Sequence, residues 1–148
     1  MTSPCGKIRI PINESSDDKS QIAEYLEAYK GEGIQHIALS TNDIHASVES
    51  LRRSDVVFQS TIDTYYEGID RRVPNHGEDL ARLKRNQILI DGGPGAGLLL
   101  QIFTTNAIGP IFFEIIQRKG NDGFGEGNFR ALFESIELDQ IRRGVLSA

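Results

Sequence analysis

A histidine and a glutamate each stand inside an apolar run of this sequence, where a polar side chain needs a partner. His36 lies between Ile34 and Ile37, and Glu114 has two apolar residues on either side. A buried carboxylate without a partner is very costly, so Glu114 is expected to be protonated, paired with a cation, hydrogen-bonded or bound to a metal. An imidazole and a carboxylate on neighbouring strands are two of the three ligands that hold Fe(II) in non-haem sites. The two residues therefore form a candidate metal site.

Both residues also have a purely structural interpretation. A histidine inside a strand is more often a hydrogen-bonded core residue than a ligand. Glu114 can pair with Arg118, which follows on the same expected strand. The spacing alone therefore leaves metal binding and a structural role both open.

The remaining histidines and the single cysteine are weaker candidates. His45 stands at an expected helix start and His76 stands in a Pro-Asn-His-Gly turn, so both are expected to face solvent. Cys5 has no second cysteine to pair with, which excludes an intramolecular disulfide and suits a reducing compartment.

An apolar segment at residues 98–103 carries two candidate pocket residues. Strand alternation places Gln101 and Phe103 on one face, opposite Leu100 and Ile102. A polar and an aromatic side chain on one face suit a ligand pocket. Phe103 is equally well explained as a core residue.

A glycine-rich segment at residues 123–129 leads into the last helix. Asn128 is expected to be the N-cap of that helix. Near the other end of the chain, Gln21 has the spacing from Asp18 of a capping-box partner.

The hydrophobic periodicity predicts alternating strands and helices along the whole chain. Strands are expected at residues 7–12, 34–39, 56–58, 87–91, 98–103 and 111–118. Helices are expected at residues 22–29, after an N-cap at Asn42, as two short helices within 64–86 broken at 74–77, and at 128–143.

These elements predict an α+β module with a curved sheet that needs a partner to close. Pro11 lacks the amide that a central strand requires, so the strand at residues 7–12 is expected at an edge and belongs to a preceding module. Residues 1–33 are expected to hold that strand and a linking helix. Residues 34–118 form the main module, and residues 119–148 form the glycine loop and last helix.

The composition suits one soluble domain. The chain has 148 residues, of which 39% are hydrophobic and 25% charged, and its net charge of -5 argues against a nucleic-acid partner. Neither a signal peptide nor an apolar run long enough for a membrane span is expected. The sequence thus predicts a cytoplasmic protein that acts on a small molecule.

Four segments at consistent intervals resemble the C-terminal domain of the 4-hydroxyphenylpyruvate dioxygenases. They are Gly31-Glu32-Gly33-Ile34-Gln35-His36-Ile37-Ala38, Leu99-Leu100-Gln101-Ile102-Phe103-Thr104, Phe112-Phe113-Glu114-Ile115-Ile116-Gln117-Arg118 and residues 123–129. The resemblance spans nearly the whole chain and implies the vicinal oxygen chelate fold, a βαβββ module shared with glyoxalase-like proteins.

The same resemblance implies an iron site. His36 and Glu114 match two Fe(II) ligands of the family, whereas the family's remaining histidine ligand comes before the region present here. The last helix is implied to close over the pocket.

The resemblance also assigns roles to neighbouring residues. Gln35, Gln101 and Asn128 match catalytic positions, although in an ideal strand Gln35 alternates away from His36. The residues that match substrate-binding positions are Asn13, Gln21, Phe103, Phe112, Phe124 and Phe129.

For a complete enzyme the implied reaction joins 4-hydroxyphenylpyruvate and dioxygen. It is an oxidative decarboxylation with ring hydroxylation that gives homogentisate, in tyrosine and phenylalanine breakdown. Hydroxymandelate synthase, which uses the same substrate and metal, is one alternative. A non-catalytic or glyoxalase-like module that binds a metal or metabolite is another. The open sheet favours a homo-oligomer.

Overall fold

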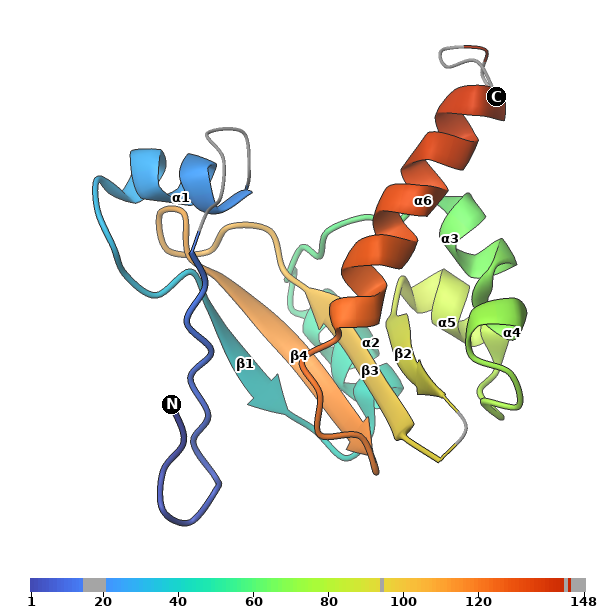
Figure 1. Ribbon diagram of the computed structural model, residues 1–148, viewed down its shortest axis with the longest axis horizontal. Coiled ribbons are helices and arrows are strands. Elements are labelled where there is room, and N and C mark those ends of the chain that lie inside the picture. The colour runs from blue at the N-terminus through green and yellow to red at the C-terminus, as the bar shows by residue number, and fades with distance from the viewer. Residues whose placement is uncertain (15–20, 94, 143, 145–148) are drawn as a thin grey trace.

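The computed structural model describes residues 1–14, 21–93, 95–142 and 144, which form an open sheet with helices on both sides (Figure 1). The strands are β1 His36–Ser40, β2 Leu89–Gly93, β3 Gly97–Phe103 and β4 Phe112–Lys119. The helices are α1 Gln21–Tyr29, α2 Ile44–Arg53, α3 Asp63–Glu67, α4 Ile69–Arg72, α5 Leu80–Asn86 and α6 Glu126–Arg142. The predicted α+β class and the βαβββ order of the module are confirmed.

The sheet is mixed, with the strand order β1-β4-β3-β2. β1 runs parallel to β4, whereas β3 is antiparallel to both β4 and β2. The parallel pairing makes His36 the partner of Phe112, and Ala38 the partner of Glu114. Strand alternation then places His36 and Glu114 on the same face of the sheet.

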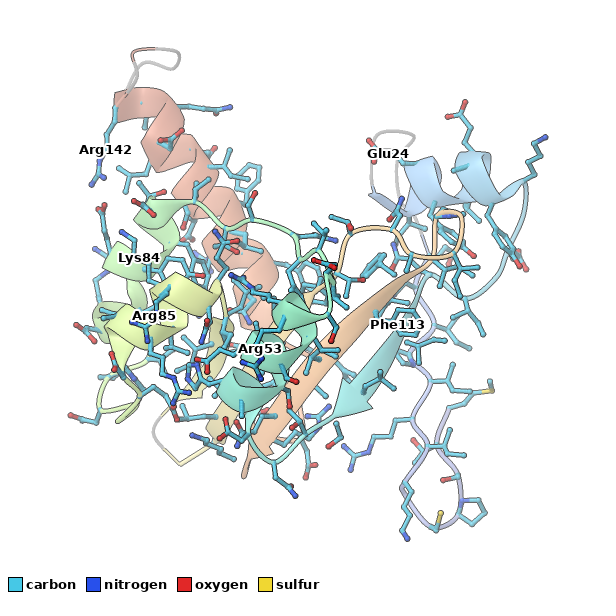
Figure 2. The ribbon with its side chains drawn as sticks, turned by 180° about the vertical axis from the view of Figure 1, so that it is seen from behind. Glu24, Arg53, Lys84, Arg85, Phe113 and Arg142 are labelled. Carbon is cyan, nitrogen blue, oxygen red and sulfur yellow. The ribbon has the colours of Figure 1, made fainter. Side chains whose placement is uncertain are left out.

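The opposite face of the sheet carries the hydrophobic core. Ile90, Leu100 and Ile102 are almost fully buried there, and they pack with residues of α2 such as Ile44 and Val48. In Figure 1 the helix α2 lies behind the sheet, and the view from behind in Figure 2 shows α2 in front of it. The sheet face that carries His36 and Glu114 is the one toward which α6 lies, and α6 contacts the edge strand β2.

The N-terminal segment does not form the expected edge strand. Residues 7–12 contribute only an isolated bridge, between Arg9 and Thr2, and the side chains of Ile8, Ile10 and Ile12 are exposed. The alternation of isoleucines predicted a strand, but a strand needs a neighbour, and the described part of the chain supplies only the adjacent residues 1–3.

Several element boundaries also differ from the prediction. The expected strand at residues 56–58 is reduced to a bridge between Phe58 and Thr104. The helix α2 is capped by Asp43, whose carboxylate accepts from the amide of Ala46, and not by Asn42. Residues 64–86 hold three short helices in place of two, with the predicted break after α4. Asn128 is the third residue of α6 and is therefore not its N-cap.

Within the described ranges, none of the helices has both the length and the apolar character that a membrane span requires.

Candidate functional site

His36 and Glu114 meet on the open face of the sheet. The Nε2 atom of His36 lies 3.7 Å from Oε2 of Glu114. The His36 ring also stacks on Phe112, with ring centroids 5.1 Å apart. The two residues that sequence reasoning singled out are thus brought together, with their nitrogen and oxygen atoms at the separation of two ligands to one ion.

The environment of Glu114 does not favour its charge. Only 6% of Glu114 is exposed, and its Oε1 atom has no hydrogen-bond partner among the described residues. Burial raises the pKa of Glu114 to about 7, and the charge of Arg118 acts in the opposite direction. An unpaired carboxylate oxygen in such a place is the kind of donor that a bound cation would satisfy.

Arg118 is not the ion-pair partner of Glu114, so that structural alternative is wrong. Its Nη1 atom donates to the carbonyl oxygens of Asn121 and Gly123, at 3.0 Å and 2.6 Å. Arg118 therefore holds the start of the glycine-rich loop and affects Glu114 only through its charge.

Burial lowers the pKa of the His36 imidazole and so favours its neutral form. Its Nδ1 atom lies 3.3 Å from Oε1 of Gln35. If Nδ1 carries the proton and donates to Gln35, Nε2 keeps its lone pair and points it toward Glu114, which is the tautomer that a metal ligand needs.

Gln35 does not alternate away from His36 as it would in an ideal strand. β1 begins at His36, so Gln35 precedes the strand and its side chain can turn back to the histidine ring. Gln35 and His36 therefore lie side by side, although they are consecutive residues.

Gln101 and two phenylalanines complete this face. Gln101 is 1% exposed, and its Oε1 atom lacks a hydrogen-bond partner within the described chain. Phe103 is the register partner of Glu114, and its ring meets that of Phe112 edge-on at 6.0 Å. The face thus combines a histidine, a carboxylate, an unpaired amide and two aromatic rings.

The glycine-rich loop lies close to this face. A Cβ atom added at Gly125 would fall 2.8 Å from Cδ of Gln101, which is closer than real Cβ atoms come. The neighbouring aromatic residues Phe124 and Phe129 are 44% and 63% exposed. They flank the loop without being packed into the core.

Asn128 lies in a separate polar cluster. It is 2% exposed, and its Oδ1 atom accepts a 2.6 Å hydrogen bond from the Tyr65 hydroxyl. The guanidinium of Arg72 stacks over the Tyr65 ring in the same cluster. Sequence reasoning gave no role to Tyr65 and Arg72, which come from the short helices α3 and α4.

Two other residues were expected to bind the substrate. Asn13 is exposed in the segment that precedes α1. The prediction for Gln21 concerns a side chain that lies outside the described ones.

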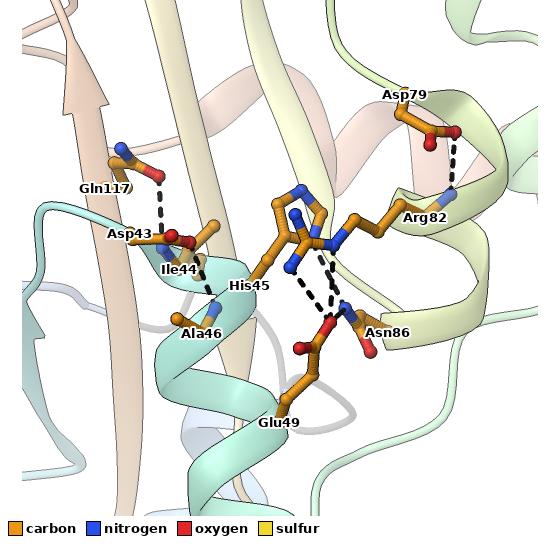
Figure 3. A network of polar contacts seen from close by, with 9 residues as sticks. All are labelled: Asp43, Ile44, His45, Ala46, Glu49, Asp79, Arg82, Asn86 and Gln117. Carbon is orange, nitrogen blue, oxygen red and sulfur yellow. Dashed lines mark hydrogen bonds and ion pairs between the residues drawn. The ribbon is translucent and has the colours of Figure 1, made fainter.

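His45 and His76 are both buried side chains, so the expectation that they face solvent is wrong. Figure 3 shows Nδ1 of His45 beside the Asn86 amide, at 3.2 Å, and Asn86 in turn donates to Glu49. His76 accepts from the amide of Glu78 and lies 3.0 Å from Asp70 through Nε2. Both rings are satisfied by structural partners.

The described residues contain no group of three or more His, Cys, Asp and Glu side chains that could hold a metal ion. His36 and Glu114 are thus a two-ligand set, and a complete site of the facial-triad type needs one more ligand.

Comparisons with known proteins agree with this architecture. No family model matches the chain. A 4-hydroxyphenylpyruvate dioxygenase of Pseudomonas aeruginosa is 69% identical over 147 residues, which cover 99% of this chain and 41% of the relative. A protein of Vibrio vulnificus named hemolysin VllY is 68% identical over 148 residues, which cover 99% of this chain and 42% of that protein. The chain therefore spans about two-fifths of the length of these curated relatives.

Two solved structures have the same fold. A mutant of 4-hydroxymandelate synthase from Streptomyces coelicolor superimposes with a TM-score of 0.66 and 36% identity, over 81% of this chain and 34% of that one. A fusion of a xylose isomerase-like TIM barrel with 4-hydroxyphenylpyruvate dioxygenase gives a TM-score of 0.72 and 31% identity, over 92% of this chain and 22% of that one. By sequence over nearly its whole length, and by fold, the chain is similar to part of proteins named 4-hydroxyphenylpyruvate dioxygenase.

Proposed function

We propose that this chain is the C-terminal part of the catalytic domain of an Fe(II)-dependent 4-hydroxyphenylpyruvate dioxygenase. The observation that carries the proposal is the half-buried His36 beside the buried Glu114, 3.7 Å apart, with one carboxylate oxygen of Glu114 unpaired among the described residues. The division into residues 1–33, 34–118 and 119–148 belongs to the same proposal.

The donor set fits Fe(II). A neutral imidazole and a carboxylate are ligands of non-haem iron, and among the described residues Oε1 of Glu114 has no hydrogen-bond partner. The chemistry that Fe(II) supplies when bound is the oxygen-dependent decarboxylation of the 2-oxo acid and the hydroxylation of its ring, which give homogentisate and carbon dioxide.

The chain's own residues bind and orient the substrate. Gln35 fixes the tautomer of His36 by accepting its Nδ1 proton. The side-chain NH2 group of Gln101 donates to the oxo-acid end, because the keto and carboxylate oxygens of the substrate accept hydrogen bonds and Gln101 is a buried polar residue on this face.

The aromatic residues form the walls of the pocket. Phe103 and Phe112 pack against the substrate ring from the sheet, while Phe124 and Phe129 exclude water from the side of α6. Asn13 and Gln21 contact the phenol end, and Asn128 belongs to the wall on α6.

The test is a hybrid enzyme in which this chain replaces the matching C-terminal region of the Pseudomonas aeruginosa relative. The hybrid is expected to consume oxygen with 4-hydroxyphenylpyruvate in an iron-dependent way and to release homogentisate. A folded hybrid that binds iron but consumes no oxygen with this substrate contradicts the proposal.

Hydroxymandelate synthase is the second candidate, because one solved structure with that name shares 36% identity with the chain. Product analysis of the same reaction separates the two. Hydroxymandelate in place of homogentisate would assign the chain to the synthase.

A further inference from the structure

The start of α6 is bound to the sheet by a residue that has no assigned role. The Oδ2 atom of Asp91, on β2, accepts a 2.9 Å hydrogen bond from the backbone amide of Gly127. The Oδ1 atom accepts from the amide of Gly92, also at 2.9 Å, which fixes the orientation of the carboxylate. Amides in the first turn of a helix lack intrahelical partners, and a carboxylate there also interacts favourably with the helix dipole.

Asp91 differs from an ordinary helix cap in its place in the sequence. Caps come from the residue before the helix, as Asp79 does for α5. Asp91 comes from a strand 36 residues before Gly127. Its hydrogen bond therefore fixes where α6 begins relative to the sheet.

Glycine makes this close approach possible. A Cβ atom added at Gly127 would lie 2.9 Å from Cγ of Asp91 and still nearer to Oδ1. At Gly125, which has a φ of +80°, an added Cβ would overlap Gln101 in the same way. Gly127 thus packs closely against Asp91 of β2, and Gly125 packs closely against Gln101 of the neighbouring strand β3.

A second contact holds the same turn of α6 to β2. Tyr65 donates to Oδ1 of Asn128, and the Tyr65 hydroxyl accepts from the amide of Ile90 at 2.9 Å. Ile90 and Asp91 are consecutive residues, so β2 holds the first turn of α6 at two adjacent positions: through the side chain of Asp91, and through the backbone of Ile90 by way of Tyr65.

The aromatic residues of this segment have little packing of their own. Phe124 and Phe129 are 44% and 63% exposed, so neighbouring side chains do not lock their positions. Their positions therefore follow the backbone that carries them. That backbone is fixed at Gly127 by Asp91 and at Asn128 by Tyr65.

We infer that Asp91 is a positioning residue: its carboxylate holds the first turn of α6 against β2, so that Phe124 and Phe129 stand over the face that carries Gln101 and Glu114. The inference rests on the proposed function, because those aromatic residues are the proposed wall of the substrate pocket. Within the described residues, Asp91 forms no hydrogen bond or ion pair with His36 or Glu114.

The first test concerns the contact itself and needs no activity. In the 148-residue chain, Gly127→Ala is expected to lower stability because its methyl group meets the Asp91 carboxylate. In the Asp91→Ala background the Gly127→Ala change should not lower the free energy of unfolding any further, since the atoms of Asp91 that the methyl group would overlap are absent. Urea denaturation of the four variants measures this coupling, and additive effects would overturn the inference.

The second test follows the position of α6. Asp91→Ala should raise the KM of the hybrid enzyme for 4-hydroxyphenylpyruvate about tenfold at unchanged iron content, the effect of one lost charge-assisted hydrogen bond. Asp91→Asn keeps an acceptor for the Gly127 amide and should restore most of the affinity. Asp79→Ala is the matched control, because it removes a helix-capping carboxylate that holds only α5.

The two tests separate the failure of this inference from the failure of the proposed function. A KM change equal in Asp91→Ala and Asp79→Ala overturns the positioning role. If the hybrid is inactive throughout, the proposed function fails, and amide hydrogen exchange at residues 124–129 decides the inference. Faster exchange there in Asp91→Ala, but not in Asp79→Ala, supports it, and equal rates contradict it.

Discussion

The environment of Glu114 and His36 suits a bound cation better than it suits the two side chains without one. Glu114 is buried with an unpaired oxygen, and His36 is held neutral by burial. A buried charge without a partner destabilises a fold, and sites that bind ligands often carry this cost. The metal-free chain should therefore be less stable than a version without the charge.

Replacing Glu114 by Gln should stabilise the metal-free chain at pH 8 by about 1–3 kcal/mol, because an uncharged amide of the same shape removes the buried charge. The same change should weaken Fe(II) binding. Urea denaturation and iron titration measure the two effects. Glu24→Gln, at an exposed position on α1 (Figure 2), is the control that should change neither. A loss of stability in Glu114→Gln would contradict the account.

At the scale of elements, the parallel pairing of β1 with β4 brings His36 and Glu114 together. On the opposite face of the sheet, α2 contacts both β4 and α5. His45 on α2 accepts from Asn86 at the end of α5, and Arg82 of α5 pairs with Glu49 of α2 at 3.2 Å. Figure 3 shows these side chains meeting between the two helices. The contact depends on a neutral His45, since a protonated Nδ1 cannot accept a hydrogen bond.

The stability of the chain should therefore fall as the pH drops below about 6.5, the ordinary pKa of histidine. Burial lowers the pKa of His45, and so does the charge of Arg82, while Glu78, Asp43 and Glu49 act in the opposite direction. The folded state thus takes up a proton at lower pH than the unfolded state. Stability is present above the unfolded pKa and is lost as the pH falls.

His45→Gln should make stability less dependent on pH between 6.5 and 5, because glutamine keeps an acceptor for Asn86 and does not titrate. Urea denaturation across this range measures the slope. An unchanged slope in His45→Gln would show that other groups are responsible.

The sequence predicted those elements whose apolar runs are long and whose neighbours are close in the chain. The strand expected at residues 111–118 matches β4 to within a residue, and the strand at 98–103 matches β3 equally well. The strand at 7–12 was wrong because alternation shows which residues can share a face, but not whether a neighbouring strand exists. The burial of His45 was missed because its partner, Asn86, lies 41 residues away.

The candidate site was predicted partly from apolar runs and partly from the family resemblance. The central positions of His36 and Glu114 came from the apolar runs around them, and their meeting required the β1–β4 register. The roles of Gln35, Gln101 and the phenylalanines came from the family resemblance and remain predictions. The contact between Asp91 and Gly127 could not be predicted, since no local pattern links a strand residue to a distant helix.

At the scale of the whole molecule, the sheet is open and the metal site is incomplete within the described residues. β1 is an edge strand, and its residues Ile37 and Leu39 are 41% and 48% exposed. The matched relatives are more than twice as long as this chain, which covers 41% of one of them. Both facts bear on how the 148-residue chain behaves alone.

The isolated chain should not convert 4-hydroxyphenylpyruvate, because two protein ligands rarely hold Fe(II) firmly. Product analysis with added Fe(II) measures this. Homogentisate formed at an enzyme-like rate by a verified monomer would contradict it.

The isolated chain should instead form a homodimer through its open sheet edge, since an unpaired apolar edge strand favours pairing with a second copy. Light scattering after size-exclusion chromatography measures the mass. Leu39→Lys places a charge on β1 and should give a monomer, whereas Ile108→Lys, at an exposed loop position, should not. A monomeric parent chain would rule out this pairing.

The most direct test of the central claim is the iron content of purified hybrid enzyme carrying either Glu114→Ala or His76→Ala. Both changes remove a side chain that could bind a metal, but only Glu114 has an unpaired oxygen beside a second ligand, whereas His76 is held by Asp70 and Glu78. The account predicts that Glu114→Ala loses its iron and that His76→Ala keeps it. Retention of iron in Glu114→Ala together with its loss in His76→Ala would contradict the assignment of the site.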